Sequence, residues 1–208
     1  VDPTTSVTTC VSITQSSVVI EAILRKQRIG FSRWYITPRN RLSSKRPEFS
    51  IDKSSLPGVK VACDFTQGIP FKDNSVDELI CIHVLEHISD LKTIMKELYR
   101  VLKTDGVLKI WVPHCFSPSA FGDSTHVRFF TFETFKQFDR QNQGSYYYDF
   151  HLDFVRSKMQ IFRRWYQPNF FDRFLEILIN LNQRRGERFL KILPYKEWEV
   201  YSELRKLQ

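Results

Sequence analysis

Residues 59–139 alternate short apolar runs with an amphipathic segment, and this alternation constrains the fold more than any other feature. Apolar runs over 59–63, 78–82 and 107–112 predict three strands. Between the second and third runs, apolar residues recur every three or four positions, which predicts a helix over 91–102. Asp90 is its expected N-cap, and Asp105-Gly106 is expected to end it. Strands that alternate with helices predict a mainly parallel sheet covered on both faces.

Weaker patterns give the remaining predicted elements. Further strands are expected over 34–37, 49–52, 146–155 and 195–207, and further helices over 18–29, 132–139 and 168–182. Residues 1–33 are interpreted as a basic, Ser/Thr-rich extension, and residues 34–208 as one domain.

Polar side chains stand where several predicted strands end. Asp52 ends the strand expected over 49–52, and Asp64, His83 and His114 come after the three apolar runs. In parallel sheets, ligands bind beyond the carboxyl ends of the strands. The sequence therefore predicts a ligand site built from these ends.

Three segments, in order along the chain, carry a resemblance to a known family. They are Ile69–Leu79 with His83–Ile88, then Glu97–Ile110, then Asp123–Phe135. With them, the run from Asp52 to Asp139 resembles the class I S-adenosylmethionine-dependent methyltransferases. The resemblance implies an α/β, Rossmann-like sheet of seven strands. That sheet is mostly parallel, with an antiparallel last strand and helices on both faces.

The resemblance also implies which residues face the cofactor and the methyl acceptor. Asp52 would bind the ribose of S-adenosylmethionine, and Asp64 with Phe65 would border the adenine. His83, His114 and His126 would lie near the acceptor as candidate bases. The alternative for all of these is structural: capped strand ends and a hydrogen-bonded network that fixes the loop 113–131. No metal is expected, because the HVLEH motif at 83–87 lacks the Glu that follows the first His in zinc-binding HExxH.

The expected glycine-rich loop is missing. Counting back from Asp52 places Arg39, Asn40 and Arg41 where the family carries glycines that face the cofactor. Glycines there permit a positive φ and let backbone N–H groups approach the ligand. A left-handed conformation costs another residue about 1–2 kcal/mol. Gly30 is a poor substitute, because no convincing strand precedes it. This departure predicts that efficient cofactor binding has been lost.

Positive charge lies at the two ends of the chain. Residues 1–47 hold eight Lys and Arg against two acidic residues, and residues 155–208 hold twelve against six, within a net charge of +8. Aromatic and basic residues are also interleaved at 162–166. Such ends suit an acidic partner, RNA or a ribonucleoprotein above all, although the same charges also serve as a solvated surface.

Two functions compete on these grounds. The first is a methyltransferase-fold protein that no longer binds cofactor efficiently and acts as a binding module. The second is an active methyltransferase with an oxygen or nitrogen acceptor. The four cysteines form no CxxC pair, which favours a reducing compartment, the cytoplasm or an organelle matrix such as that of mitochondria. No apolar run reaches the roughly 18 residues of a membrane span.

Overall fold

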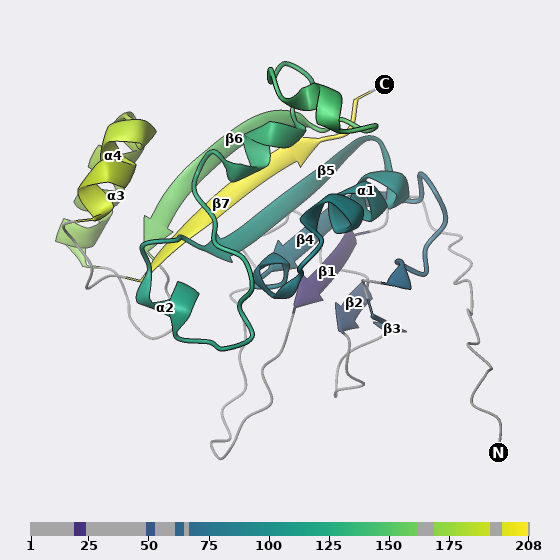
Figure 1. Ribbon diagram of the computed structural model, residues 1–208, viewed down its shortest axis with the longest axis horizontal. Coiled ribbons are helices and arrows are strands. Elements are labelled where there is room, and N and C mark those ends of the chain that lie inside the picture. Colours follow the sequence, from purple (N-terminus) through teal and green to yellow (C-terminus); the bar gives the residue numbers. More distant parts are fainter. Residues whose placement is uncertain are drawn as a thin grey trace, which may run out of the picture.

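The computed structural model describes residues 19–23, 49–52, 61–64, 67–161, 169–191 and 197–207, and every structural statement concerns these residues. Their strands form one sheet in the order β3-β2-β1-β4-β5-β7-β6 (Figure 1). The four long strands are β4 (Val76–Ile82), β5 (Leu102–Pro113), β6 (Asp153–Ile161) and β7 (Trp198–Arg205). The sheet continues through the shorter β1 (Val19–Ile23), β2 (Phe49–Asp52) and β3 (Val61–Ala62).

The strand directions confirm an α/β fold. Strands β3, β2, β1, β4 and β5 pair in parallel, whereas β7 pairs antiparallel with both β5 and β6. The strand predicted over 195–207 is therefore the antiparallel strand. The strand predicted over 34–37 lies outside the described residues.

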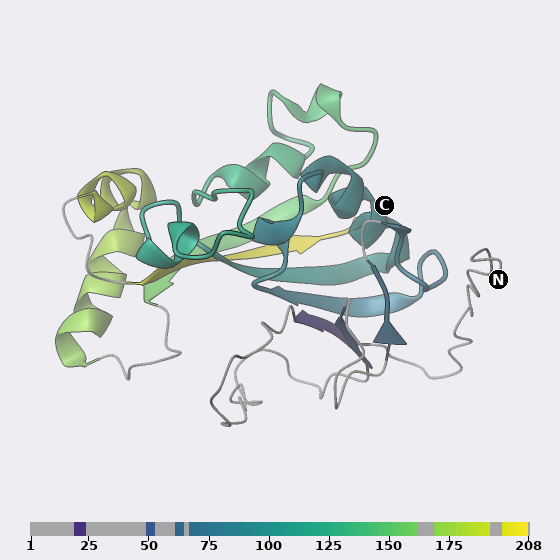
Figure 2. The same cartoon turned by 60° about the horizontal axis from the view of Figure 1, so that its bottom comes forward.

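Helix α1 (Leu91–Val101) covers one face of the sheet, as Figure 2 shows. The Asp90 side chain accepts a hydrogen bond from the Thr93 backbone N–H at 3.0 Å, which confirms the predicted N-cap. The buried face of α1 joins one apolar cluster with strand residues such as Leu79 and Leu108. This packing fixes α1 on that face of the sheet.

The end of α1 differs from the prediction. The helix stops at Val101, and β5 begins at Leu102, which is fully buried and pairs with Val76. Asp105 and Gly106 instead make an irregularity inside β5, where Asp105 has a φ of +64°. A Cβ on Gly106 would lie 2.7 Å from the Lys103 carbonyl oxygen, so the bend requires glycine. The free energy gained by burying Leu102 in the sheet exceeds what a longer α1 would contribute.

Residues 19–23 overturn the helix predicted over 18–29, because they form β1 between β2 and β4. A short apolar run fits a buried parallel strand as well as a helix, and periodicity alone does not separate the two. The sheet thus includes part of the segment that was assigned to an N-terminal extension.

Two other predicted elements are corrected, and one is confirmed. The helix predicted over 132–139 is a 3₁₀ turn, η3 (Thr134–Phe138), and the strand predicted over 146–155 is replaced by η4 (Ser145–Tyr147) and β6. Aromatic packing of Phe138 with Tyr148 and Phe150 holds this region in turns. The helix predicted over 168–182 is α3 (Phe170–Leu181), with α4 (Gln183–Leu190) directly after it.

Helices α3 and α4 lie beside the β6 edge of the sheet (Figure 2). The Asn180 amide group bonds the backbone N–H and carbonyl of Met159, and the Ile161 N–H donates to Glu176. These bonds satisfy backbone groups that an edge strand would otherwise expose. Among the described residues, no helix has the length and apolar character needed to cross a bilayer.

Candidate functional site

The site lies where neighbouring parallel strands end at one edge of the sheet. Strands β1 and β4 finish together, with Ile23 opposite Ile82, and Asp52 of β2 lies opposite Ala62 of β3. Asp64 follows β3 by two residues, is half-buried, and accepts a hydrogen bond from the Gln67 N–H at its backbone oxygen. The backbone therefore brings the predicted Asp52, Asp64 and His83 positions to one edge.

Several predicted cofactor residues cannot be placed in this site. Phe65 and the Arg39, Asn40, Arg41 segment lie outside the described residues, and the side chain of Asp52 is likewise not described. The sequence directly after β1 reads Leu24, Arg25 and Lys26, and the first glycine there is Gly30. The placement of β1 thus moves the start of the expected loop, but brings no glycine to it.

His83 begins the site at the end of β4, with a φ of +51°. Its Nδ1 lies 3.1 Å from Glu86 Oε1, and its Nε2 lies 2.6 Å from Glu199 Oε1 on β7. Burial opposes the imidazolium charge, but hydrogen bonds to Glu199 and Glu86 outweigh it and raise the pKa of His83 to about 10. With both nitrogens bonded to carboxylates, His83 is arranged as a charged link between β4 and β7.

His114 lies at the end of β5 and is completely buried. Its Nδ1 accepts a hydrogen bond from the Phe116 N–H at 3.1 Å, so the proton resides on Nε2, which donates to Glu187 Oε1 at 2.9 Å. Burial lowers the pKa of His114, against the opposing effect of Glu187. The ring links β5 to α4 and presents no surface to a ligand.

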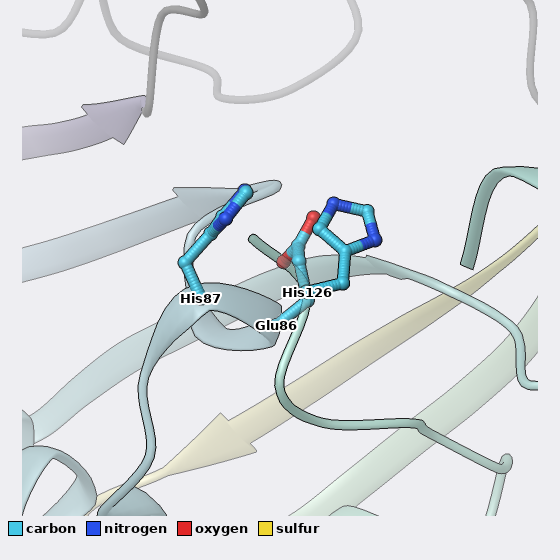
Figure 3. A group of neighbouring side chains, drawn as sticks. All are labelled: Glu86, His87 and His126. Carbon is cyan, nitrogen blue, oxygen red and sulfur yellow. The ribbon is translucent and has the colours of Figure 1, made fainter. Parts of the chain in front are cut away.

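His126, unlike His83 and His114, lies next to His87 and Glu86 (Figure 3). Glu86 and His87 belong to the turn η2 (Leu85–His87), directly after β4. One ligand atom from each of the three side chains lies within 4.8 Å of the others, and the two rings meet edge to face with centroids 4.7 Å apart. We call these three residues the Glu-His-His cluster.

The loop that carries His126 is held on η2 by backbone bonds. The N–H groups of Val127 and Arg128 both donate to the Glu86 carbonyl, at 2.8 and 3.2 Å. The Arg128 guanidinium donates to the carbonyl oxygens of Ile88 and Ser89. Residues 40 positions apart in sequence are thereby fixed side by side.

Hydrogen bonds determine which nitrogens of the cluster carry protons. His126 Nδ1 lies 3.1 Å from the Ala120 carbonyl oxygen, which can only accept, so the proton is on Nδ1 and the lone pair is on Nε2. The Thr125 hydroxyl donates to Asp123 at 2.7 Å, so His87 Nδ1, 2.9 Å from that hydroxyl, is also a donor. Burial lowers the pKa of His87, which keeps the ring neutral.

Sequence reasoning grouped His83, His114 and His126 as candidate bases, but the structure separates them. His83 is bonded to two carboxylates, and His114 is bonded inside the core; only His126 lies in the cluster. Two partners were missed, Glu199 and Glu187. Nothing local marks Glu187, whereas Glu199 is a charged residue in a strand that is otherwise apolar at its start.

Comparisons with known proteins show two sequence similarities. Residues 42–110 match the family model described as a methyltransferase domain. Over 44 residues, 21% of this chain, the sequence is 48% identical to the uncharacterized protein MJ0638 of Methanocaldococcus jannaschii. The match spans 19% of that protein's length.

Solved structures of low sequence identity are also similar. A SAM-dependent methyltransferase from Archaeoglobus fulgidus is 17% identical, with 76% of this chain and 75% of that chain covered and a TM-score of 0.46. A Haemonchus contortus phosphoethanolamine N-methyltransferase 2 with S-adenosyl-L-methionine is 16% identical, with 77% and 43% covered and a TM-score of 0.46.

Proposed function

Starting from a chain that belongs to the class I S-adenosylmethionine-dependent methyltransferase superfamily, we propose that it is a methyltransferase with an oxygen or nitrogen acceptor. The proposal includes the full architecture of that superfamily, a seven-stranded sheet with helices on both faces. The observation that supports activity best is the Glu-His-His cluster, whose ring lone pairs and buried carboxylate stand beyond the end of β4. A buried carboxylate oxygen without a partner is costly, and this cost is best explained by a ligand.

S-adenosylmethionine is the cofactor of this family and supplies the methyl group when bound. The described residues fit it at two strand ends. Asp64 is half-buried after β3, and the end of β2 brings Asp52 beside β3. Asp52 and Asp64 are therefore the proposed contacts to its ribose and adenine, with Phe65 beside Asp64. The sequence after β1 does not fit as well, because it lacks glycine until Gly30.

Among the three predicted bases, His126 is the proposed one. The acceptor's lone pair would form the new bond to the methyl carbon while the carbon–sulfur bond breaks, and Nε2 of His126 would take the acceptor's proton. In the neutral ring, donation from Nδ1 to the Ala120 carbonyl leaves the lone pair on Nε2, which lies 3.9 Å from Asp123 Oδ2. His83 and His114 have both nitrogens engaged.

Calorimetry with S-adenosylmethionine and S-adenosylhomocysteine tests cofactor binding. We expect micromolar dissociation constants, about −8 kcal/mol, and at least tenfold weaker binding by Asp64→Asn. Asp149→Asn is the matched control, because Asp149 is exposed and paired with Lys96 elsewhere on the molecule. No binding at millimolar ligand by the folded wild-type protein would refute the proposed activity.

A second function is favoured by a specific observation, the absence of glycine between the end of β1 and Gly30. On this alternative, the protein binds cofactor poorly and is a module for an acidic partner such as RNA. The exposed basic side chains of α4, Arg184, Arg185 and Arg188, support it. The same calorimetry decides: no cofactor binding, together with RNA binding that weakens steeply with salt, would establish the module.

A further inference from the structure

One carboxylate oxygen of Glu86 is buried without a hydrogen-bond partner among the described residues. The residue is 1% exposed. Its Oε1 is bonded to His83, but among the described residues its Oε2 has no hydrogen-bond partner. In Figure 3 the carboxylate lies between the rings of His87 and His126. A buried, unpartnered carboxylate oxygen calls for a compensating group, and an ion is one of the few that fit.

Each of the two rings has one nitrogen that can bind a metal ion, and a ligand atom of each ring lies within 4.8 Å of the carboxylate and of the other ring. Because Nδ1 of each ring donates a hydrogen bond, to the Thr125 hydroxyl and to the Ala120 carbonyl, each Nε2 carries a lone pair. Metal-binding histidines characteristically donate their second N–H in this way to an oxygen that fixes the ring. Thr125 is held in turn, because its hydroxyl and backbone N–H both donate to Asp123.

We propose that Glu86, His87 and His126 bind one divalent transition-metal ion of the zinc class. Two imidazoles and one carboxylate are a donor set that suits Zn²⁺, and three protein ligands leave a position open for water or another oxygen ligand. In a tetrahedral site with bonds of about 2.0–2.2 Å, two ligand atoms on one ion lie about 3.3–3.6 Å apart. The cluster atoms, within 4.8 Å of one another, must therefore close by up to about 1.5 Å.

The surrounding charges favour a cation there. The Asp123 carboxylate lies 3.9 Å from His126 Nε2, and Glu199 lies behind His83. The His83 imidazolium offsets part of this negative charge but is bonded to the other oxygen of Glu86. A divalent cation would complete the balance at the unpartnered oxygen.

This inference goes beyond the proposed methyl transfer and does not depend on it. The open position of the ion would face the carboxyl end of β4, where an oxygen-bearing acceptor is expected. When the ion is bound, the lone pair of His126 Nε2 is used for the metal, so the proposed role of His126 as base applies to the metal-free protein. Metal binding and cofactor binding are measured in separate experiments. A chain that binds no metal can still bind S-adenosylmethionine, and a chain that binds no cofactor can still bind the metal.

The test uses the purified full chain after chelator treatment, titrated with Zn²⁺ and with Co²⁺ alone. We expect one equivalent per chain, visible Co²⁺ d–d absorption, and a rise in the thermal unfolding midpoint on binding. His126→Gln removes a ligand and should abolish stoichiometric binding. Thr125→Val leaves the ligands in place but removes the group that orients His87, and should weaken binding by about 10–100-fold.

His151→Gln is the matched control, because His151 lies outside the cluster, and it should bind like the wild-type protein. Circular dichroism checks that each variant is folded. The proposal is overturned if the wild-type chain takes up no ion at millimolar concentration, or if folded His126→Gln binds one equivalent as tightly as the wild type. Retained full affinity in folded Thr125→Val would overturn the inference that Thr125 orients His87 for the ion.

Discussion

At the residue scale, His83 links three parts of the molecule. Its two nitrogens bond Glu86 on η2 and Glu199 on β7, and both carboxylates are nearly buried. Without the imidazolium, two acidic groups would face each other away from water, which is strongly unfavourable. The protonated ring thus holds Glu86 in the orientation that presents its second oxygen to His87 and His126.

The raised pKa of His83 predicts a pH-dependent stability. The value is about 10 in the folded chain and about 6.5 in an unfolded one. The stabilisation is therefore complete below pH 6.5 and is lost as the pH rises toward 10. Denaturant titrations should give a free energy of unfolding that falls by a few kcal/mol across this window. His83→Gln should lose about 3–5 kcal/mol at pH 6.

The pH dependence of the variant provides the control. His83→Gln has no ring to titrate, so its loss of stability between pH 6.5 and 10 should be much smaller than in the wild-type protein. Equal slopes in the two proteins would mean that His83 is not charged in the folded chain.

At the element scale, Lys206 joins the end of β7 to the end of α1. Its Nζ donates to the carbonyl oxygens of Tyr99 and Leu102, at 2.8 and 2.9 Å, and to Asn74 Oδ1 at 2.8 Å. It also lies 4.1 Å from the centre of the Tyr99 ring. The last carbonyls of a helix lack intrahelical donors, so this side chain supplies one from a distant strand.

Lys206→Met should lower the free energy of unfolding by about 2–3 kcal/mol, because it leaves buried carbonyl oxygens without a donor. Lys103→Met is the matched control. Lys103 pairs with Asp77 near the surface, so its loss should cost less than about 1 kcal/mol. Urea titrations of both variants measure the difference, and equal effects would contradict a capping role for Lys206.

At the scale of the whole molecule, β7 joins the edge strand β6 to the rest of the sheet. It lies between β5 and β6 and pairs antiparallel with both. Seven of its eight residues, all but Arg205, are buried. It also carries Glu199 to His83, so the last strand of the chain completes a site that begins at β4.

A chain that ends at residue 197 should therefore fail to fold, since β6 would have no neighbour and β5 would expose an edge. A chain that ends at Lys206 is the control and should keep the native thermal transition, because Leu207 is exposed. Circular dichroism with thermal melting measures both. A cooperative transition in the shorter chain would show that β7 is dispensable.

Local apolar patterns predicted much of the fold. Helix α1, its Asp90 cap, and strands β2, β4 and β7 agree with the sequence, because each reads as one short periodic or apolar run. The predictions for the α1–β5 junction and for the segment that forms β1 were wrong. At both places a segment has two plausible local conformations, and pairing with distant strands selects one.

The sequence by itself indicated a resemblance to the class I methyltransferases, the order of the central elements, and the gathering of Asp52, Asp64 and His83 at one edge. Only the tertiary structure decided the role of each histidine. His83 and His114 are fixed by Glu199 and Glu187, which lie 116 and 73 positions away. His126 meets His87 because backbone bonds hold its loop on η2. Protonation depends on such neighbours, and sequence spacing does not specify them.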